Sequence, residues 1–100
     1  SAALTEKINA EVRRGLKTEA ALKQLAKEND VVIVIGSPES ANSNRLFEIS
    51  QRVNPKSHFI QRASELEDKW FAKAKKVAVT AGASTPGWII EDVIKKIKSL

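Results

Sequence analysis

The hydrophobic pattern alternates between stretches typical of strands and stretches typical of helices. Five β-branched residues in a row, Val31 to Ile35, are typical of a strand buried on both faces, as in a parallel sheet covered by helices. Shorter apolar stretches predict further strands at residues 57–61 and 76–80. Apolar residues three or four positions apart predict helices over the other segments, at residues 3–14, 18–28, 46–53, 64–74 and 86–97.

The order of these elements sets the expected fold. Strands that alternate with helices form βαβ units, whose right-handed crossovers place helices on both faces of a parallel sheet. We therefore predict one α/β domain over residues 1–100, a three-layer sandwich with a parallel three-stranded sheet in the order 2-1-3. Leu4, Ile8, Val12 and Leu16 recur every fourth position, which predicts that residues 1–17 are helical.

The amino-acid composition excludes several kinds of chemical site. The 100 residues include no cysteine and one histidine, His58, which excludes disulfides, thiolate ligands for zinc or iron–sulfur clusters, and multi-histidine metal sites. The net charge of +5 is modest and basic residues lie among acidic ones, so nucleic acid is not an expected partner.

No apolar run approaches the ~20 residues that span a bilayer and no signal peptide is evident, so we expect a cytoplasmic protein. The absence of methionine predicts a processed, excised or engineered chain.

Hydroxyl-rich loops follow the first and third predicted strands, at residues 36–43 and 80–85. In a parallel sheet, ligands bind beyond the carboxyl ends of the strands, and with this strand order both loops overhang one crevice. Each loop carries a glycine and leads into a helix N-terminus, which presents unpaired N–H groups and a partial positive charge. Hydroxyls and the Asn42 amide can donate to phosphate oxygens, so the pattern predicts an anion site for phosphate or diphosphate.

A purely structural interpretation of the same residues stays open. Asn42 or Ser43 can cap the first of these helices, and Ser84 or Thr85 the second, without binding a ligand. Neither loop matches a Walker A or a G-x-G-x-x-G sequence, so a nucleotide is only weakly indicated.

A catalytic constellation is not evident. Glu91 and Asp92 are adjacent on a predicted helix, so their carboxylates are expected to point in different directions. We expect Trp70 and Trp88 to pack in the core, and His58 to be structural or to face solvent.

Two motifs taken together resemble a known family. The segments V-V-I-V-I-G-S-P-E-S-A-N-S-N-R-L (31–46) and V-A-V-T-A-G-A-S-T-P-G-W (77–88) resemble the C-terminal, third domain of 4-hydroxy-3-methylbut-2-enyl diphosphate reductase. That family is the iron–sulfur oxidoreductase of the non-mevalonate pathway of isoprenoid biosynthesis. The resemblance covers residues 18–100, and residues 1–17 do not match it.

The resemblance implies a role for both loops. The family has three similar α/β domains around an iron–sulfur cluster, and each domain supplies one cysteine. Its serine and asparagine side chains hold the substrate's diphosphate, which implies that Ser40, Asn42 and Ser84 are diphosphate-binding residues here. Ala41 stands where a second serine is often found and keeps only its backbone N–H for binding.

Two departures from the family affect the expected cofactor and the charge near the anion site. The cysteine of this domain would fall within residues 10–15, at or near Val12, but none is present, so we expect no cofactor in this chain. The first loop carries Pro38 and Glu39 where the family has Lys-Asn, and the Glu39 carboxylate places a negative charge near the anion site.

These observations predict an isolated reductase-like domain that keeps a remnant diphosphate site and is catalytically inactive alone. We expect it to bind a diphosphate or phosphate weakly, to associate through the former interdomain face, and to make no membrane contact. The alternative is an excised or engineered α/β scaffold that binds no ligand. Neither hypothesis assigns a catalytic or a metal-binding residue.

Overall fold

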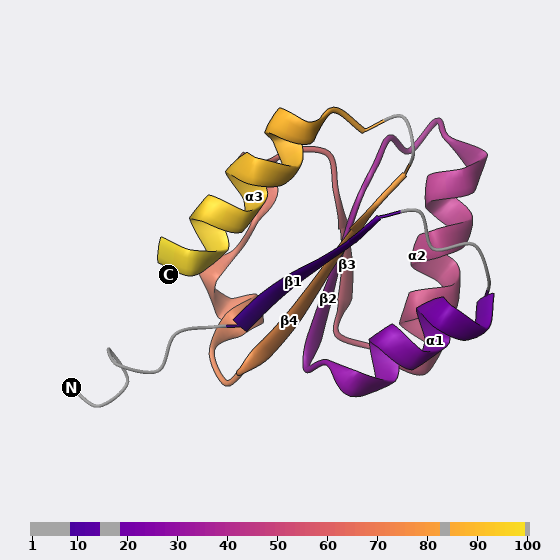
Figure 1. Ribbon diagram of the computed structural model, residues 1–100, viewed down its shortest axis with the longest axis horizontal. Helices are drawn as coiled ribbons and strands as arrows, with labels where there is room; N and C mark the ends of the chain where they lie inside the picture. Colours follow the sequence, from indigo (N-terminus) through magenta and orange to yellow (C-terminus); the bar gives the residue numbers. More distant parts are fainter. Residues whose placement is uncertain (1–8, 15–18, 83–84, 100) are drawn as a thin grey trace.

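A four-stranded parallel sheet forms the centre of the molecule. The computed structural model describes residues 9–14, 19–82 and 85–99, and its strands lie in the order β1-β4-β2-β3 (Figure 1). The strands are β1 (Asn9–Arg14), β2 (Val31–Ile35), β3 (Ser57–Ile60) and β4 (Lys76–Ala81). The helices are α1 (Glu19–Glu28), α2 (Ala41–Val53), α3 (Gly87–Ser99) and the 3-10 helices η2 (Ala63–Glu65) and η3 (Asp68–Phe71).

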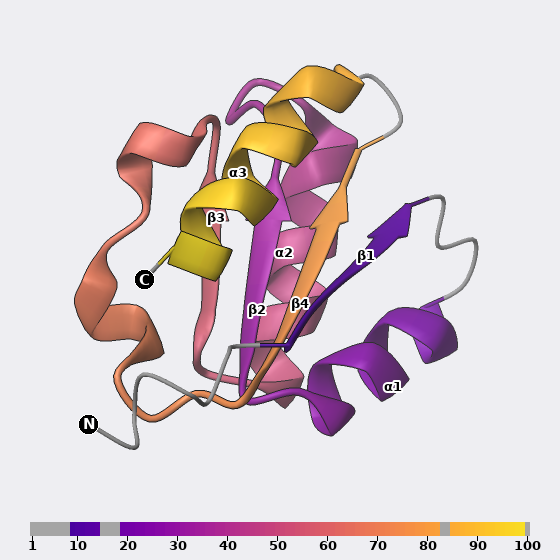
Figure 2. The same ribbon diagram turned by 60° about the vertical axis from the view of Figure 1, so that its left-hand side comes forward.

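Helices cover both faces of the sheet, as Figures 1 and 2 show. On one face, α1 and α2 pack against β2, where Leu25 and Ala26 belong to one cluster with Val32 and Val34. On the other face, α3 and the segment that contains η2 and η3 pack over the alternate residues of the same strands. Every residue of β2 is buried, because a strand in this position has helices on both sides. The predicted α/β architecture is confirmed.

The predicted strands are present in the predicted order, but the sheet has one strand more. The order β3-β2-β4 is the expected 2-1-3 and is confirmed, whereas the count of three strands was wrong. The helix predicted over residues 3–14 was also wrong where the structure describes it, because Asn9–Arg14 is β1. This strand pairs with β4 from Asn9↔Lys76 to Arg14↔Ala81. Hydrogen bonding along the open edge of β4 outweighs a short helical periodicity. The rest of that predicted helix lies outside the described residues.

The single helix predicted over residues 64–74 is replaced by η2 and η3. Leu66 and Phe71 are both buried in the cluster beneath this segment. Residues five positions apart point about 140° away from each other on an α-helix, so one regular helix could not bury both. The chain therefore crosses this face of the sheet in two short 3-10 helices, and the α-helix expected to start at Ser64 does not form.

Asp30 ties the amino ends of β2 and β4 together. Its carboxylate accepts the backbone N–H groups of Lys75 at 2.9 Å and Lys76 at 3.0 Å. These two hydrogen bonds lower the pKa of Asp30 below its ordinary value of 3.8. With the amino ends fixed, the register runs on to Ile35↔Ala81, so the two strands end level with each other.

His58 and Trp70 stack on each other and hold η3 against β3. Their ring centroids lie 3.9 Å apart and the rings are within 5° of parallel. Burial lowers the pKa of His58 below its ordinary 6.5, and the nearby Glu67 carboxylate opposes this shift. His58 thus has the structural role expected from the sequence.

Candidate anion site at the carboxyl edge of the sheet

The two hydroxyl-rich loops begin side by side, where β2 and β4 end. The Gly82 N–H donates to the carbonyl oxygen of Ile35 at 3.3 Å, and the Gly36 N–H donates to that of Ile60 at 3.0 Å. The chain leaves β2 through α2 on one face of the sheet and leaves β4 through α3 on the other face (Figure 2). Open parallel sheets bind ligands at such a switch point.

Ser43 fills the space between the two loops. Its side chain is 2% exposed, although it lies near the start of α2. A Cβ atom added to Gly36 would lie 2.5 Å from the Ser43 Cβ, and one added to Gly82 would lie 3.0 Å from the Ser43 Oγ. Both glycines therefore allow the N-terminus of α2 to pack directly against the ends of β2 and β4.

The first turn of α2 presents backbone N–H groups to solvent. Ser40 is the N-cap, and its Oγ accepts the Ser43 N–H at 3.3 Å. Within the part of the chain that the structure describes, the N–H groups of Ala41 and Asn42 have no acceptor. Both residues are exposed, and the first turn contains no acidic residue. This helix end therefore suits a small anion.

Asn44 holds the loop before α2 in shape. Its Nδ2 donates to the carbonyl oxygens of Pro38 at 2.7 Å and of Ser40 at 3.0 Å. In the same loop, the Ser37 Oγ accepts the Glu39 N–H at 3.2 Å. We did not predict this role from the sequence, although an asparagine four residues after an N-cap can bond back to the loop.

Thr85 fixes the second loop to the end of β2. Its side chain is buried, and its Oγ1 donates to the carbonyl oxygen of Ile35 at 3.4 Å. Its N–H donates to the carbonyl oxygen of Gly82 at 3.0 Å. Gly82 and Thr85 are therefore both held at the end of β2.

The structure brings together three of the four predicted site residues. Ser40, Ala41 and Asn42 share the N-cap and first turn of α2. Ser84 lies outside the described residues. The alternative that Asn42 or Ser43 caps the helix was wrong, because Ser40 is the N-cap. The binding roles of these residues stay a prediction.

Two adjoining hollows open beside this edge, between η2 and α3. The smaller, about 250 Å³, includes Gly36, Ser37 and Thr85 in its wall, and the larger, about 420 Å³, includes Ser64, Trp88 and Asp92. Gln61, Arg62 and Ile89 line both. Trp88 was expected in the core, but its position at the start of α3 leaves it 66% exposed.

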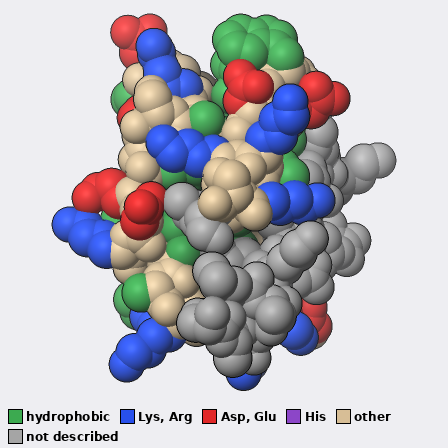
Figure 3. All heavy atoms as spheres, turned by 90° about the vertical axis from the view of Figure 1, so that its left-hand side faces the viewer, with side chains coloured by type: hydrophobic (Ala, Val, Ile, Leu, Met, Phe, Trp, Pro, Cys, Tyr) green, Lys and Arg blue, Asp and Glu red, His purple; other side chains and the backbone are tan. Residues whose placement is uncertain are grey.

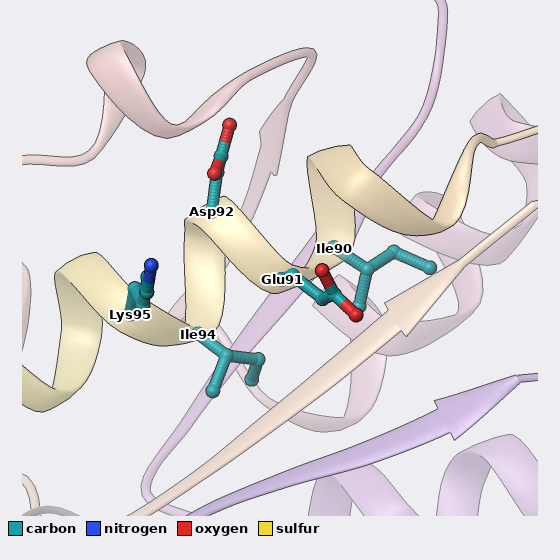
Figure 4. Close-up of a pocket in the computed structure, with 5 residues that line it drawn as sticks. All are labelled: Ile90, Glu91, Asp92, Ile94 and Lys95. Atoms are coloured by element: carbon teal, nitrogen blue, oxygen red, sulfur yellow. The ribbon is translucent and has the colours of Figure 1, made fainter.

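A third hollow, about 410 Å³, lies along the middle of α3 and carries no evident chemistry. In Figure 4, Glu91 and Asp92 leave the helix in different directions, so they are not a catalytic pair, as the sequence indicated. Asp92 also points away from Ile94, which lies on the opposite side of the helix (Figure 4).

The residues that the structure describes do not fit a metal or cluster site. Among them, no group of three His, Asp or Glu side chains could hold a metal ion. The sequence contains no cysteine. Because iron–sulfur clusters are held by cysteine thiolates, this chain does not fit as a ligand of such a cluster. Across the described segments, no helix is long and apolar enough to cross a membrane.

The fold and this edge define a class: an open, parallel α/β domain whose candidate ligand site lies at the switch point of the sheet. The family model described as LytB protein matches residues 13–98, and the chain belongs to that family. The match starts within β1, so the predicted boundary at residue 18 was too late.

Curated relatives carry the name 4-hydroxy-3-methylbut-2-enyl diphosphate reductase. The relative from Aquifex aeolicus is 45% identical over 82 residues, which are 82% of this chain and 28% of the relative. The relative from Geotalea daltonii is 46% identical over 78 residues, which are 78% of this chain and 28% of the relative. The chain thus spans less than a third of these relatives.

Solved structures agree with this assignment. A structure of (E)-4-hydroxy-3-methyl-but-2-enyl diphosphate reductase, the terminal enzyme of the non-mevalonate pathway, superposes with a TM-score of 0.78 at 45% identity. That match covers 82% of this chain and 29% of the other. The structure of the E-1-hydroxy-2-methyl-but-2-enyl-4-diphosphate reductase from Plasmodium falciparum gives a TM-score of 0.70 at 27% identity, covering 77% and 24%.

Proposed function

We propose that this chain is a diphosphate-binding domain of the LytB type, with the diphosphate held between the first turn of α2 and the loop after β4. One observation carries the proposal. The exposed N–H groups of Ala41 and Asn42 have no acceptor in the described part of the chain, and they lie at the switch point of the sheet. The names of the relatives, which are reductases of a diphosphate, support the choice of anion.

Each proposed contact has its own chemistry. Ala41 and Asn42 donate backbone N–H groups, and the Asn42 amide adds a side-chain donor. The Ser40 and Ser84 hydroxyls complete the set as further donors. A single domain surrounds only part of such a ligand, so we expect a dissociation constant of about 1 mM.

Reduction of the diphosphate is not part of the proposal for this chain alone. A two-electron reduction needs an electron donor, and the chain offers no cysteine thiolate to hold an iron–sulfur cluster. The chain spans less than a third of its relatives, so association with other domains would have to supply the rest of the site. The cytoplasmic location expected from the sequence stays a prediction.

Calorimetric titration of the chain with isopentenyl diphosphate tests the proposal. Asn42→Asp places a negative charge beside the proposed diphosphate, and an acid in the first turn does not disfavour the helix. The matched control is Gln51→Glu, the same change of amide to acid at an exposed position farther along α2.

We expect the wild-type chain and the Gln51→Glu variant to bind alike, and Asn42→Asp to bind at least tenfold more weakly. If the wild-type chain gives no heat of binding at 10 mM ligand, the alternative of a scaffold without a ligand replaces this proposal. Equal binding by both variants would place the ligand elsewhere on the molecule.

A further inference from the structure

We infer that two copies of this chain bind each other through the larger hollow between η2 and α3, related by a two-fold axis that runs into the hollow. The hollow measures about 420 Å³, and its walls are formed by residues 61–64 and by Trp88, Ile89 and Asp92 of α3. All of these residues lie in the described part of the chain. The inference goes beyond the proposed function and does not depend on it.

Trp88 gives this surface its largest apolar group. Its side chain is 66% exposed, and among the described residues it is the one large hydrophobic side chain with such exposure. The half-buried Ile89 and Ala63 line the same hollow. On the face shown in Figure 3, a small hydrophobic cluster at the upper end has acidic and basic side chains beside it. Apolar groups surrounded by polar ones are typical of protein–protein interfaces, in which tryptophan is enriched.

The two walls of the hollow carry opposite charges. Arg62 belongs to the wall at η2 and Asp92 to the wall at α3. Both residues are exposed, and within the described part of the chain neither forms an ion pair. A two-fold axis through the hollow exchanges the walls, so Arg62 of each copy meets Asp92 of the other. The surface is therefore complementary in charge to itself.

This charge pattern favours a second copy over a different partner. The chain carries a net charge of +5, so two copies repel each other over much of their surface. The walls of this hollow carry one positive and one negative charge, Arg62 and Asp92, and so have no net charge. A strongly acidic or strongly basic partner would bring a like charge against one of them, whereas a second copy satisfies both.

The walls are held in place before association. The Glu65 Oε2 accepts the N–H of Gln61 at 2.8 Å and that of Arg62 at 3.0 Å, which fixes the wall at η2. The wall at α3 is fixed by Ile90 and Val93, which are buried in the core. Little conformational freedom is therefore lost when two copies meet.

The contact is small, so the dimer should be weak. Seven residues line the hollow, whereas a standard interface has roughly 20–30 residues on each side. We expect a dissociation constant of about 0.1 mM. Sedimentation equilibrium of the whole chain from 10 µM to 1 mM should then show the average mass rising from one chain toward two. Over the same range, the amide NMR signals of residues 61–64 and 88–92 should shift with concentration.

Charge reversal tests which surfaces meet. Arg62→Asp and Asp92→Arg each bring like charges together at both symmetric contacts, and each should weaken the dimer at least tenfold. Glu91→Arg is the matched control for Asp92→Arg, because it makes the same change of charge at an exposed neighbour that leaves α3 in another direction (Figure 4). This control should dimerise as the wild type does. Circular dichroism checks that each variant is folded.

Mixing the two weakened variants tests the two-fold arrangement itself. In a pair of Arg62→Asp with Asp92→Arg, both contacts again join an acid to a base. Each substitution changes the net charge by two, from +5 to +3 and to +7, so the overall charges repel and cannot cause binding. We expect the equimolar mixture to dimerise about as tightly as the wild type, while each variant alone stays monomeric.

Trp88→Ala should weaken the wild-type dimer at least tenfold, because it removes the largest apolar contact. A wild-type chain that is monomeric at 1 mM would overturn the inference, whatever other protein covers this surface. A dimer that survives both charge reversals, or a mixture of the two variants that stays monomeric, would overturn it as well. None of these results involves a diphosphate, so each would leave the proposed function standing.

Discussion

The Ser43 side chain lies where a side chain on Gly36 would have to be. A Cβ on Gly36 would approach the Ser43 Cβ to 2.5 Å, a distance that real Cβ contacts do not reach. This close packing joins the end of β2 to the first turn of α2. The geometry of the candidate site therefore depends on one glycine and one small, buried residue.

Gly36→Ala is expected to lower the free energy of unfolding by about 1–3 kcal/mol, because the added methyl group overpacks the contact with Ser43. Gly87→Ala is the matched control, since a Cβ there meets nothing within 4 Å. Urea denaturation of both variants measures the effect. A Gly36→Ala variant as stable as the wild type would show that Ser43 does not fill this space.

Glu39→Lys is expected to strengthen diphosphate binding by about threefold to fivefold, because it replaces a negative charge by a positive one beside the first turn of α2. Glu48→Lys is the control, the same change at an exposed position in the middle of α2. Titrations at 20 mM and 200 mM salt should show the gain shrinking as salt screens it. An equal gain from both variants would indicate a general charge effect and no local anion site.

Asp30→Asn is expected to lower stability at pH 7 by less than about 1 kcal/mol, because an exposed carboxylate loses two charge-assisted hydrogen bonds. The pKa of Asp30 is lowered in the folded chain. The contribution of its carboxylate to stability is therefore complete above pH 3.8, its ordinary pKa, and is lost as the pH falls from there through the lower folded-state value. Denaturation at pH 7 and at pH 2.5 should show the difference between wild type and variant shrinking in acid. A difference in stability that is the same at both pH values would mean that the charge of Asp30 does not contribute to it.

The stack of His58 on Trp70 predicts a second dependence of stability on pH. Burial lowers the pKa of His58, so its contribution to stability is complete above 6.5 and is lost as the pH falls through the folded-state value. His58→Phe keeps a stacked ring but removes the titration. The loss of stability between pH 7.5 and pH 5 should be smaller in this variant than in the wild type. An equal loss in both proteins would assign the pH dependence to other groups.

The strongest local patterns in the sequence predicted the centre of the fold. Val31–Ile35 is β-branched throughout, and its burial on both faces follows from that pattern. Strand β1 was missed because its position depends on pairing with β4, which lies more than sixty residues away in the sequence. The failed helix over residues 64–74 has a similar cause, since the burial of both Leu66 and Phe71 decides the path of the chain there.

The residue types of the candidate site and its location at the carboxyl edge of the sheet were predictable from the sequence. Serine and asparagine after a buried strand indicated the N-terminus of α2, and Ser40 lies there as its N-cap. The packing of Ser43 between two glycines and the exposure of Trp88 depend on three-dimensional neighbours. Neither follows from the spacing of residues along the chain.

The central claim is that the first turn of α2 and the loop after β4 bind a diphosphate. A nitrogen-15 NMR titration with isopentenyl diphosphate tests it most directly, because it locates binding at single amide groups. The account predicts that the amide signals of residues 40–43 and 83–85 shift together and saturate in the millimolar range. Unchanged signals in both loops at 10 mM ligand, with the chain folded, would contradict it.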